Sequence, residues 1–567
     1  MRDAKNGPSL AACLGVAAWL AACLWYPLTD TDIWWHLAAA DWMRAHRTVP
    51  RADPFSLSSL GTAWTDLHWG FQAAAGFAWR TGGAAALIGA KCAAVIGAIF
   101  LVLRPHLSGR TWPWLLPLAA AGGCLVRFQL DVRPLALTLL GLGIQYAAVT
   151  AFLRGRLRGP IWILVPVQAA LANVQGLYPL GLALVGSLTA GEALACRRKG
   201  FAPAFPEARP VPLRPLAVAL ALMVLAGFAT PYGWDGFRLP LALLARIAPD
   251  ASNIFSREIA ENRPFTDLFA SDPVTASACL AWAAAVGWTF RRGRLPAGHA
   301  LLCLAFGALG LAAQRNLPLA LLAGLAAAGR NLEVSPAGPP GRAEPGRAAL
   351  AGWAALAAVA LVFAPRLRAA WAYELPGSLV TPFRVPGAAV DLLAARPLPG
   401  PIFNELRFGG YLEFRLHPRP AFVDGRMILR SGAFYRDFLD AVDHPELFPE
   451  YRARYGFTHA LLPIAEGGRF RPLAAGLLAA GWDLLYCDGA AVLLADPALA
   501  AGGMPLDSLG AGHPLPEAVR KRYGPNPRLF RLASACAAAF LMEAGRVRAA
   551  ADLAAFAAGT RNLDASP

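Results

Sequence analysis

Two aspartates that directly follow a long apolar run are the first residues in this sequence whose types and spacing could do chemistry. The run occupies residues 8–28, and Asp30 and Asp32 come immediately after it. Carboxylates at this place either cap a following helix or face a polar pocket, where one can take or orient the proton of an acceptor hydroxyl. His36 likewise either makes a structural hydrogen bond or takes part in the reaction. Asp30, Asp32 and His36 are therefore the candidate catalytic residues.

Several cationic side chains stand at the tips of apolar hairpins that are too short to cross a bilayer twice. Residues 297–329 would span about 50 Å as helix, whereas two crossings need about 60 Å. Polar backbone at membrane depth is tolerated where it lines a cavity or packs within protein. We infer a polar pocket recessed below the outer surface, the alternative being ordinary short loops with snorkelling arginines. The tips carry Arg127, Gln129, Asp131 and Arg133, then Asn173 and Gln175, then Gln314, Arg315 and Asn316.

One further cation, Lys91, lies inside the apolar run 84–103. It either snorkels to the membrane surface or reaches into the pocket to meet an anion. Arginine and lysine side chains in such a pocket can steady a phosphate as negative charge develops on it.

The elements that position these residues are read from the apolar runs and the charges. Only 16% of the residues are charged, against roughly 25% in an average soluble domain. Apolar runs that are candidate membrane spans occur eleven times, at 8–28, 84–103, 112–126, 134–153, 160–173, 176–196, 215–230, 272–290, 297–313, 317–329 and 349–364. With the N-terminus inside, the basic clusters fall in the inner loops, as expected for cytoplasmic loops. These clusters account for nearly all of the net charge of +16, so the charge reports membrane topology and not a nucleic-acid partner.

The predicted protein is thus an α-helical polytopic membrane protein with a C-terminal α/β extracytoplasmic domain and a short helical tail. Residues 1–365 form the transmembrane domain, with a first outer loop at 29–83 and a cytoplasmic linker at 330–348. The α/β domain covers 366–500. A linker and one helical hairpin of tetratricopeptide type cover 501–567.

Within the outer parts the patterns predict further elements. Residues 400–426 alternate like strands, with a turn at Gly409-Gly410 and a second turn at Asp424-Gly425. Residues 453–497 follow a strand–helix–strand–strand pattern. An interfacial helix is expected near 236–248. The charged segment 257–264, which contains Glu261, is either a mobile loop that closes over a substrate or a solvated charge cluster. Cys487 and Cys536 are the two outer-face cysteines and could pair.

The motifs together resemble the GT-C membrane glycosyltransferases, and more closely a bacterial branch of them. The matching features are Asp30-Thr-Asp32-Ile-Trp34-Trp35-His36-Leu37 after the first span, the long first outer loop that continues with Asp53-Pro54-Phe55-Ser56, Pro231-Tyr232-Gly233, Arg315-Asn316-Leu317-Pro318-Leu319, Phe403-Asn404-Glu405, and Phe422-Val423-Asp424-Gly425-Arg426. The resemblance extends to about residue 498. Each motif alone is weak, and their combination is specific.

The resemblance implies transfer of a sugar from a polyprenyl-phosphate donor, which enters from the outer leaflet, to a hydroxyl of a lipid, glycan or protein acceptor. Asp30 and Asp32 correspond to the acidic residues that act as base or position the acceptor. The residues implied to bind the donor phosphate are Arg133, Arg315, Arg127 and Lys91. The remaining pocket residues implied are Trp34, Trp35, His68, Asp131, Asn173, Gln175, Tyr232, Glu261 and Asn316.

Two departures from the family pattern leave metal dependence open. The chain has His68-Trp69 where His-Glu-Trp is expected, and Asn173-Val-Gln175 where relatives often have Asn-x-His. An acid or a metal ligand is therefore missing. No cofactor is certain, and a divalent metal such as Mg or Mn, if one is used, would be held by Asp30 and Asp32.

The resemblance also implies a place in the bacterial inner membrane, with the N-terminus cytoplasmic and the C-terminal domain periplasmic. Two other functions stay open. A flippase or transporter of a lipid-linked glycan often shows related halves, and no internal repeat is visible here. A catalytically inactive membrane scaffold would use the outer domain and the tail instead of the aspartates.

Overall fold

The computed structural model describes residues 7–155, 160–197, 203–205, 212–246, 253–292, 295–334, 345–465, 468–499, 502–507, 509 and 512–559. These residues form two compact units, and each unit is built from two stretches of chain. The first unit contains residues 1–26 and 65–367. The second contains residues 27–64 and 368–567. Most of the predicted cytoplasmic linker, residues 335–344, lies outside the described residues, as do residues 247–248 of the predicted interfacial helix.

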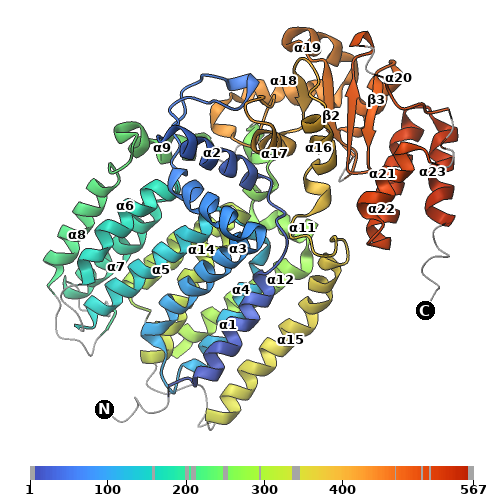
Figure 1. The fold of residues 1–567 in the computed structure, drawn as a ribbon. Coiled ribbons are helices and arrows are strands. Elements are labelled where there is room, and N and C mark those ends of the chain that lie inside the picture. Colours follow the sequence, from blue (N-terminus) through green and yellow to red (C-terminus); the bar gives the residue numbers. More distant parts are fainter. Residues whose placement is uncertain are drawn as a thin grey trace. The chain divides into compact units, whose positions relative to one another are not determined.

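The first unit is helical (Figure 1). Its helices are α1 (Leu10–Leu24), α3 (Trp69–Leu103), α4 (Trp112–Leu125), α5 (Pro134–Leu153), α6 (Leu164–Val174), α7 (Pro179–Arg197), α8 (Leu213–Ala226), α9 (Gly233–Arg246), α10 (Ile254–Arg257), α11 (Leu268–Ser271), α12 (Pro273–Trp288), α13 (Ala297–Ala312), α14 (Leu317–Val334) and α15 (Pro345–Trp371). The short 3-10 turns η4 (Arg127–Gln129), η6 (Ala260–Asn262) and η9 (Gln314–Asn316) interrupt them. The helix α3 is kinked at Gly82 and Gly83, where the predicted second span begins.

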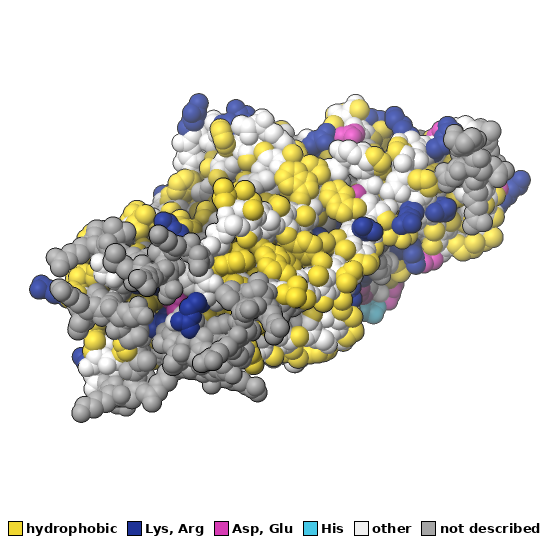
Figure 2. Space-filling model, turned by 90° about the horizontal axis from the view of Figure 1, so that it is seen from below, with side chains coloured by type: hydrophobic (Ala, Val, Ile, Leu, Met, Phe, Trp, Pro, Cys, Tyr) yellow, Lys and Arg dark blue, Asp and Glu magenta, His cyan; other side chains and the backbone are white. Residues whose placement is uncertain are grey.

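Each of the eleven apolar runs forms a helix, as the sequence predicts. Among the described residues, three helical segments are long and apolar enough to cross a membrane, namely Trp69–His106, Pro134–Leu153 and Pro179–Arg197. Six other apolar helices are shorter, so the number of spans stays a prediction. Hydrophobic side chains cover much of the described surface of the helices seen in Figure 2, with few charged side chains among them. An exposed apolar surface of this kind fits contact with lipid.

The second unit contains a small mixed sheet. Its strands are β1 (Ile402–Asn404), β2 (His459–Pro463), β3 (Asp483–Cys487) and β4 (Ala491–Ala495), in the order β1-β2-β4-β3. The pair β1–β2 is parallel and the other two pairs are antiparallel. The helices of this unit are α2 (Asp32–His46), α16 (Gly387–Ala395), α17 (Leu406–Leu416), α18 (Gly432–Asp443), α19 (Phe448–Tyr455), α20 (Arg471–Ala479), α21 (Pro514–Tyr523), α22 (Pro527–Glu543) and α23 (Val547–Gly559).

The strand–helix–strand–strand pattern at 453–497 and the terminal helix pair are confirmed by β2, α20, β3, β4, α22 and α23. The prediction of alternating strands over 400–426 with a turn at Gly409-Gly410 is wrong, whereas the chain does turn at Asp424-Gly425. Only β1 is a strand there, and the Gly409-Gly410 pair lies inside α17 instead of in a turn. Both glycines are needed by close packing, since a side chain at 410 would meet the backbone nitrogen of Trp35 at 2.9 Å. Cys487 and Cys536 are both free thiols.

Candidate functional site

Asp30 and Asp32 stand at the first turn of α2, within the second unit. The Asp30 carboxylate accepts a hydrogen bond from the backbone nitrogen of Asp32 at 3.0 Å, so Asp30 does cap the turn that leads into α2. Asp30 is buried, whereas Asp32 is partly exposed. Before the turn, Leu28 is hydrogen-bonded to Leu379 and Thr381, which fixes the entry of the chain into α2.

Trp34, Trp35 and His36 follow on the buried side of α2. Trp34 meets the ring of Tyr411 edge-on at 4.9 Å, and the rings of Trp35 and His36 lie 3.6 Å apart. The tryptophans therefore pack α2 against α17 and its surroundings. His36 comes one helical turn after Asp32, so the two side chains leave the same face of α2.

A buried ion cluster, which the sequence patterns did not predict, lies beside this helix. Arg426 forms ion pairs with Asp424 at 2.7 Å, with Asp53 at 2.8 Å and with Glu413 at 3.3 Å. Arg430 also reaches Asp424, at 3.1 Å. Every member is at most 4% exposed. Asp53 belongs to the first outer loop and the others to the C-terminal part of the chain, so the cluster joins the two stretches of the second unit.

The charges within the cluster are set by its surroundings. Burial, together with the neighbouring Asp424 carboxylate, raises the pKa of Glu413 well above its ordinary value. Burial by itself would raise the pKa of Asp424, but Arg426 and Arg430 hold that pKa well below its usual range. Of the two carboxyl groups, Glu413 therefore takes up a proton more readily, and Asp424 stays ionised beside the guanidinium groups of Arg426 and Arg430.

In the first unit, Lys91 and Arg127 are both used at the end of α1. Lys91 Nζ donates to the carbonyl of Leu24 at 2.6 Å, and Arg127 Nε donates to that of Cys23 at 2.8 Å. Both cations also lie over the ring of Tyr26, at 3.7 and 4.8 Å from its centroid. These contacts satisfy carbonyls that α1 leaves without a helical partner and place positive charge at its C-terminus. Lys91 is thus held by a carbonyl, whereas the sequence left snorkelling and anion binding open.

Arg133 and Arg315 are each bound by the segment that contains Glu261. Arg133 forms an ion pair with Glu261, and Arg315 donates to Asn262 Oδ1 at 3.1 Å. Gln314 anchors the same segment through its backbone nitrogen, which donates to the carbonyl of Arg263 at 3.0 Å. The turns η4 and η6 both pack against η9, so two of the three predicted polar tips do lie together.

The third tip makes different contacts. Asn173 accepts a hydrogen bond from Trp69 Nε1 at 2.7 Å and donates to the carbonyl of Ala229. Gln175 accepts from Thr138, which lies one turn into α5 beyond Arg133. The other implied pocket residues are placed by short local contacts: Asn316 donates to Leu309, the carbonyl of Asp131 accepts from the backbone nitrogen of Arg133, and the backbone nitrogen of Tyr232 donates to Thr230.

Asp66 is a candidate residue that the motif comparison missed. It is fully buried, and one of its oxygens has no hydrogen-bond partner among the described residues. The other oxygen accepts from the backbone nitrogen of His68 at 3.0 Å. Gln72, one turn further along α3, is also fully buried with neither side-chain polar atom bonded within the described part of the chain. The signal in the sequence is an acid two residues before His68, whereas the family pattern has its acid directly after the histidine.

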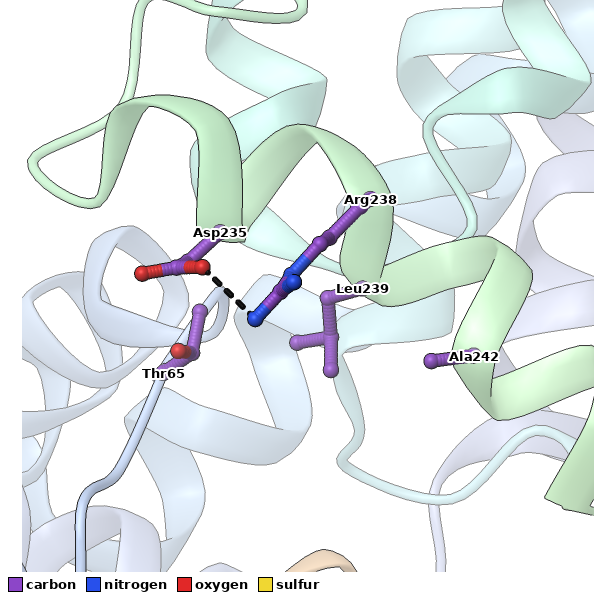
Figure 3. Close-up of a pocket in the computed structure, with 5 residues that line it drawn as sticks. All are labelled: Thr65, Asp235, Arg238, Leu239 and Ala242. Atoms are coloured by element: carbon purple, nitrogen blue, oxygen red, sulfur yellow. Dashed lines mark ion pairs between the residues drawn. The ribbon is translucent and has the colours of Figure 1, made fainter.

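Thr65 opens the same stretch and lines a cavity of about 420 Å³ (Figure 3). The other lining residues come from α9: Asp235, Arg238, Leu239 and Ala242. Arg238 and Asp235 form an exposed ion pair of 2.9 Å at its edge. The helix α9 confirms the helix predicted near 236–248, and its Trp234 and Leu241 are exposed.

The residues present allow only a limited metal site. Across the described ranges, no three side chains of His, Cys, Asp and Glu gather closely enough to hold a metal ion. A metal bound by Asp30 and Asp32 would need its remaining ligands from water or from a substrate phosphate, which is the way Mg²⁺ is commonly held.

Comparisons with known proteins identify the fold. No protein-family model matches the chain, and no curated protein matches it in sequence. Its structure is similar to that of the archaeal oligosaccharyltransferase AglB from Archaeoglobus fulgidus in complex with an inhibitory peptide and a dolichol-phosphate, with a TM-score of 0.50 and 14% identity over 80% of this chain and 69% of that one. The apo form of the Archaeoglobus fulgidus oligosaccharyltransferase gives 0.49 and 13% over 83% and 70%. ArnT from Cupriavidus metallidurans bound to undecaprenyl phosphate gives 0.44 and 13% over 86% and 97%. The likeness to AglB shows that the chain shares the fold of that oligosaccharyltransferase.

Proposed function

We propose that this chain, built on the GT-C fold, is a membrane glycosyltransferase that moves a sugar from a polyprenyl-phosphate donor to an acceptor hydroxyl. The observation that carries the proposal is the placement of Asp32 on this fold: a partly exposed carboxylate at the first turn of the helix after α1, with Asp30 already used to cap that turn. The structural neighbour AglB was solved with a dolichol-phosphate, a lipid carrier of the proposed class.

In this mechanism Asp32 takes or orients the proton of the acceptor hydroxyl, and His36 assists from the same face of α2. The hydroxyl oxygen attacks the anomeric carbon as the bond to the phosphate oxygen breaks, so the configuration inverts. Arg133 and Arg315 bind the departing lipid phosphate and stabilise its charge. The reaction takes place on the periplasmic face of a bacterial inner membrane, with a lipid, glycan or protein as acceptor.

The test is an assay of the purified chain against a panel of polyprenyl-phosphate sugars. We expect one donor to raise the melting temperature and to release polyprenyl phosphate when an acceptor is present. Asp32→Asn should lower the release by at least about a hundredfold while it leaves donor stabilisation unchanged, because only the proton acceptor is lost. Parallel reactions with EDTA, and with Mg²⁺ or Mn²⁺ restored, decide metal dependence.

Donor binding without release, with the Asp32→Asn chain equal to wild type, would contradict the proposal. Such a result would favour a transporter or a scaffold. Asp437→Asn, which removes an exposed carboxylate from α18, is the matched control and should behave as wild type.

A further inference from the structure

The Asp424-Gly425-Arg426 turn touches the candidate base directly. A methyl group on Gly425 would overlap Asp32 Oδ1 and would lie 3.8 Å from Trp35 Nε1. We infer that this turn is a seat that positions the Asp32 carboxylate, so that the C-terminal part of the chain helps to build the active site. The inference rests on the proposed function for its catalytic meaning, and on geometry alone for the seat itself.

The need for glycine at 425 comes from the contact and not from backbone conformation. The φ of Gly425 lies outside the left-handed region, so alanine is compatible with the backbone there. The added methyl group would therefore act chiefly on its neighbour, the Asp32 carboxylate. This makes Gly425→Ala a probe of the position of Asp32.

The turn is held rigidly by the ion cluster. Asp424 Oδ1 accepts from the backbone nitrogen of Arg426 at 2.6 Å and from its Nε at 3.0 Å, which closes the turn on itself. Ser56 donates to Asp424 from the first outer loop, and Arg426 Nη2 donates to Ser56 at 2.8 Å. Glu413, on α17, binds Arg426 from another side. Residues on three separate elements thus fix the backbone that Asp32 touches.

The stack of rings around Arg426 completes this support. Its guanidinium lies 4.6 Å from the ring of Trp64 and 5.2 Å from that of Phe55. Trp64 in turn meets Trp35, three residues after Asp32, at 6.4 Å. The first turn of α2 is therefore held both by the Gly425 backbone and by aromatic packing that leads back to the same arginine.

A base held in this way needs little reorganisation before it accepts a proton. A displacement of about 1 Å at a reacting group can cost roughly a hundredfold in rate. Asp424, Gly425 and Arg426 are accordingly positioning residues, which act on the acceptor only through Asp32.

The experiment is a double-mutant cycle of Gly425→Ala and Asp32→Ala in the full chain, read by thermal unfolding. We expect Gly425→Ala to lower the melting temperature in the wild-type background and to have a much smaller effect when Asp32 is already alanine, because the overlap is then gone. The matched control is Gly476→Ala, an exposed site in α20 where the new methyl group would meet only Pro445 at an ordinary 3.8 Å. It should show no coupling to Asp32. Equal destabilisation by Gly425→Ala in both backgrounds would contradict the inference that the Gly425 backbone positions Asp32.

Kinetic measurements test whether the contact between Gly425 and Asp32 matters for catalysis. Gly425→Ala should lower kcat by about tenfold to a hundredfold and change the donor KM by less than about threefold, since donor binding does not depend on Asp32. An unchanged kcat would overturn the positioning role. If the wild-type chain releases polyprenyl phosphate from no donor, the proposed function fails, and the unfolding cycle still decides whether the seat exists.

Discussion

The buried carboxylate of Asp66 is a candidate functional group that the sequence around it does not indicate. A buried carboxylate oxygen without a partner lowers stability, and such a group is retained when it has a role beyond folding. We therefore expect Asp66→Asn to raise the free energy of unfolding by about 1–3 kcal/mol while lowering donor turnover at least about tenfold. Asparagine keeps the acceptor for the His68 nitrogen, so the turn is preserved.

The measurement pairs the melting temperature with release of polyprenyl phosphate from the same preparations. A loss of both stability and turnover would show that Asp66 serves folding alone.

At this scale the sequence was informative about residue type and less so about role. It left capping and catalysis open for Asp30, and only the hydrogen bond to the Asp32 nitrogen places a cap there. It grouped Lys91 and Arg127 with the phosphate-binding cations. In the structure both are bound to the end of α1 and to Tyr26, a contact between residues far apart in the chain that no local pattern indicates. Their part in phosphate binding stays a prediction, as does that of Arg133 and Arg315.

The helix α17, which packs against α2, is the element that was predicted wrongly from the sequence. Glycine pairs mark turns in many sequences. Here Gly410 allows α17 to approach α2, and Gly409 allows it to approach the backbone of Val423, so the apolar alternation belongs to a helix packed on several sides. The ion cluster beside this contact could not be predicted from local sequence patterns either. Its members are dispersed over two stretches of chain, and each alone looks like a surface charge.

The protonation state of Glu413 can be tested at this contact. If Glu413 is neutral, Glu413→Gln keeps both its charge and its shape, and the free energy of unfolding should change by less than about 1 kcal/mol. Asp424→Asn leaves two buried arginines with one carboxylate and should cost about 3–5 kcal/mol. Chemical unfolding of the two variants beside wild type checks this, and equal losses would mean that Glu413 is ionised.

For the whole molecule, the sequence was most reliable where composition alone decides structure. An apolar run in lipid must satisfy its backbone as a helix, and all eleven apolar runs do form helices. The division of the chain into two compact units was harder to predict from the sequence. The whole of residues 29–83 was assigned to the membrane domain, whereas residues 27–64 group with the C-terminal part. That grouping depends on contacts between distant segments, which periodicity and composition do not encode.

The stability of the molecule should fall in mild acid because of His459 in β2. Its side chain is fully buried, and burial together with Arg419 lowers its pKa to about 4. The unfolded chain, with an ordinary histidine pKa near 6.5, therefore binds the proton first, so stability is complete above about pH 6.5 and is lost as the pH falls towards 4. The loss from this group is at most about 3 kcal/mol.

Melting temperatures between pH 7 and 4 provide the measurement. His459→Asn should reduce the acid slope, and the matched variant His444→Asn, at an exposed site, should leave it as in wild type. An unaltered slope in His459→Asn would contradict the assignment.

The union of two distant stretches in one unit also has a consequence for how the protein is made. Ser56 and Glu413, which are hydrogen-bonded in the ion cluster, are separated by 357 residues. At roughly 5–20 residues per second, a ribosome needs about 20–70 s to supply the second after the first. During that time α2 has emerged with its tryptophans and no partner to cover them. We expect the nascent segment to require shielding until the C-terminal part is made. A chain that ends before residue 426 would lack the backbone that positions Asp32, and we expect it to be inactive.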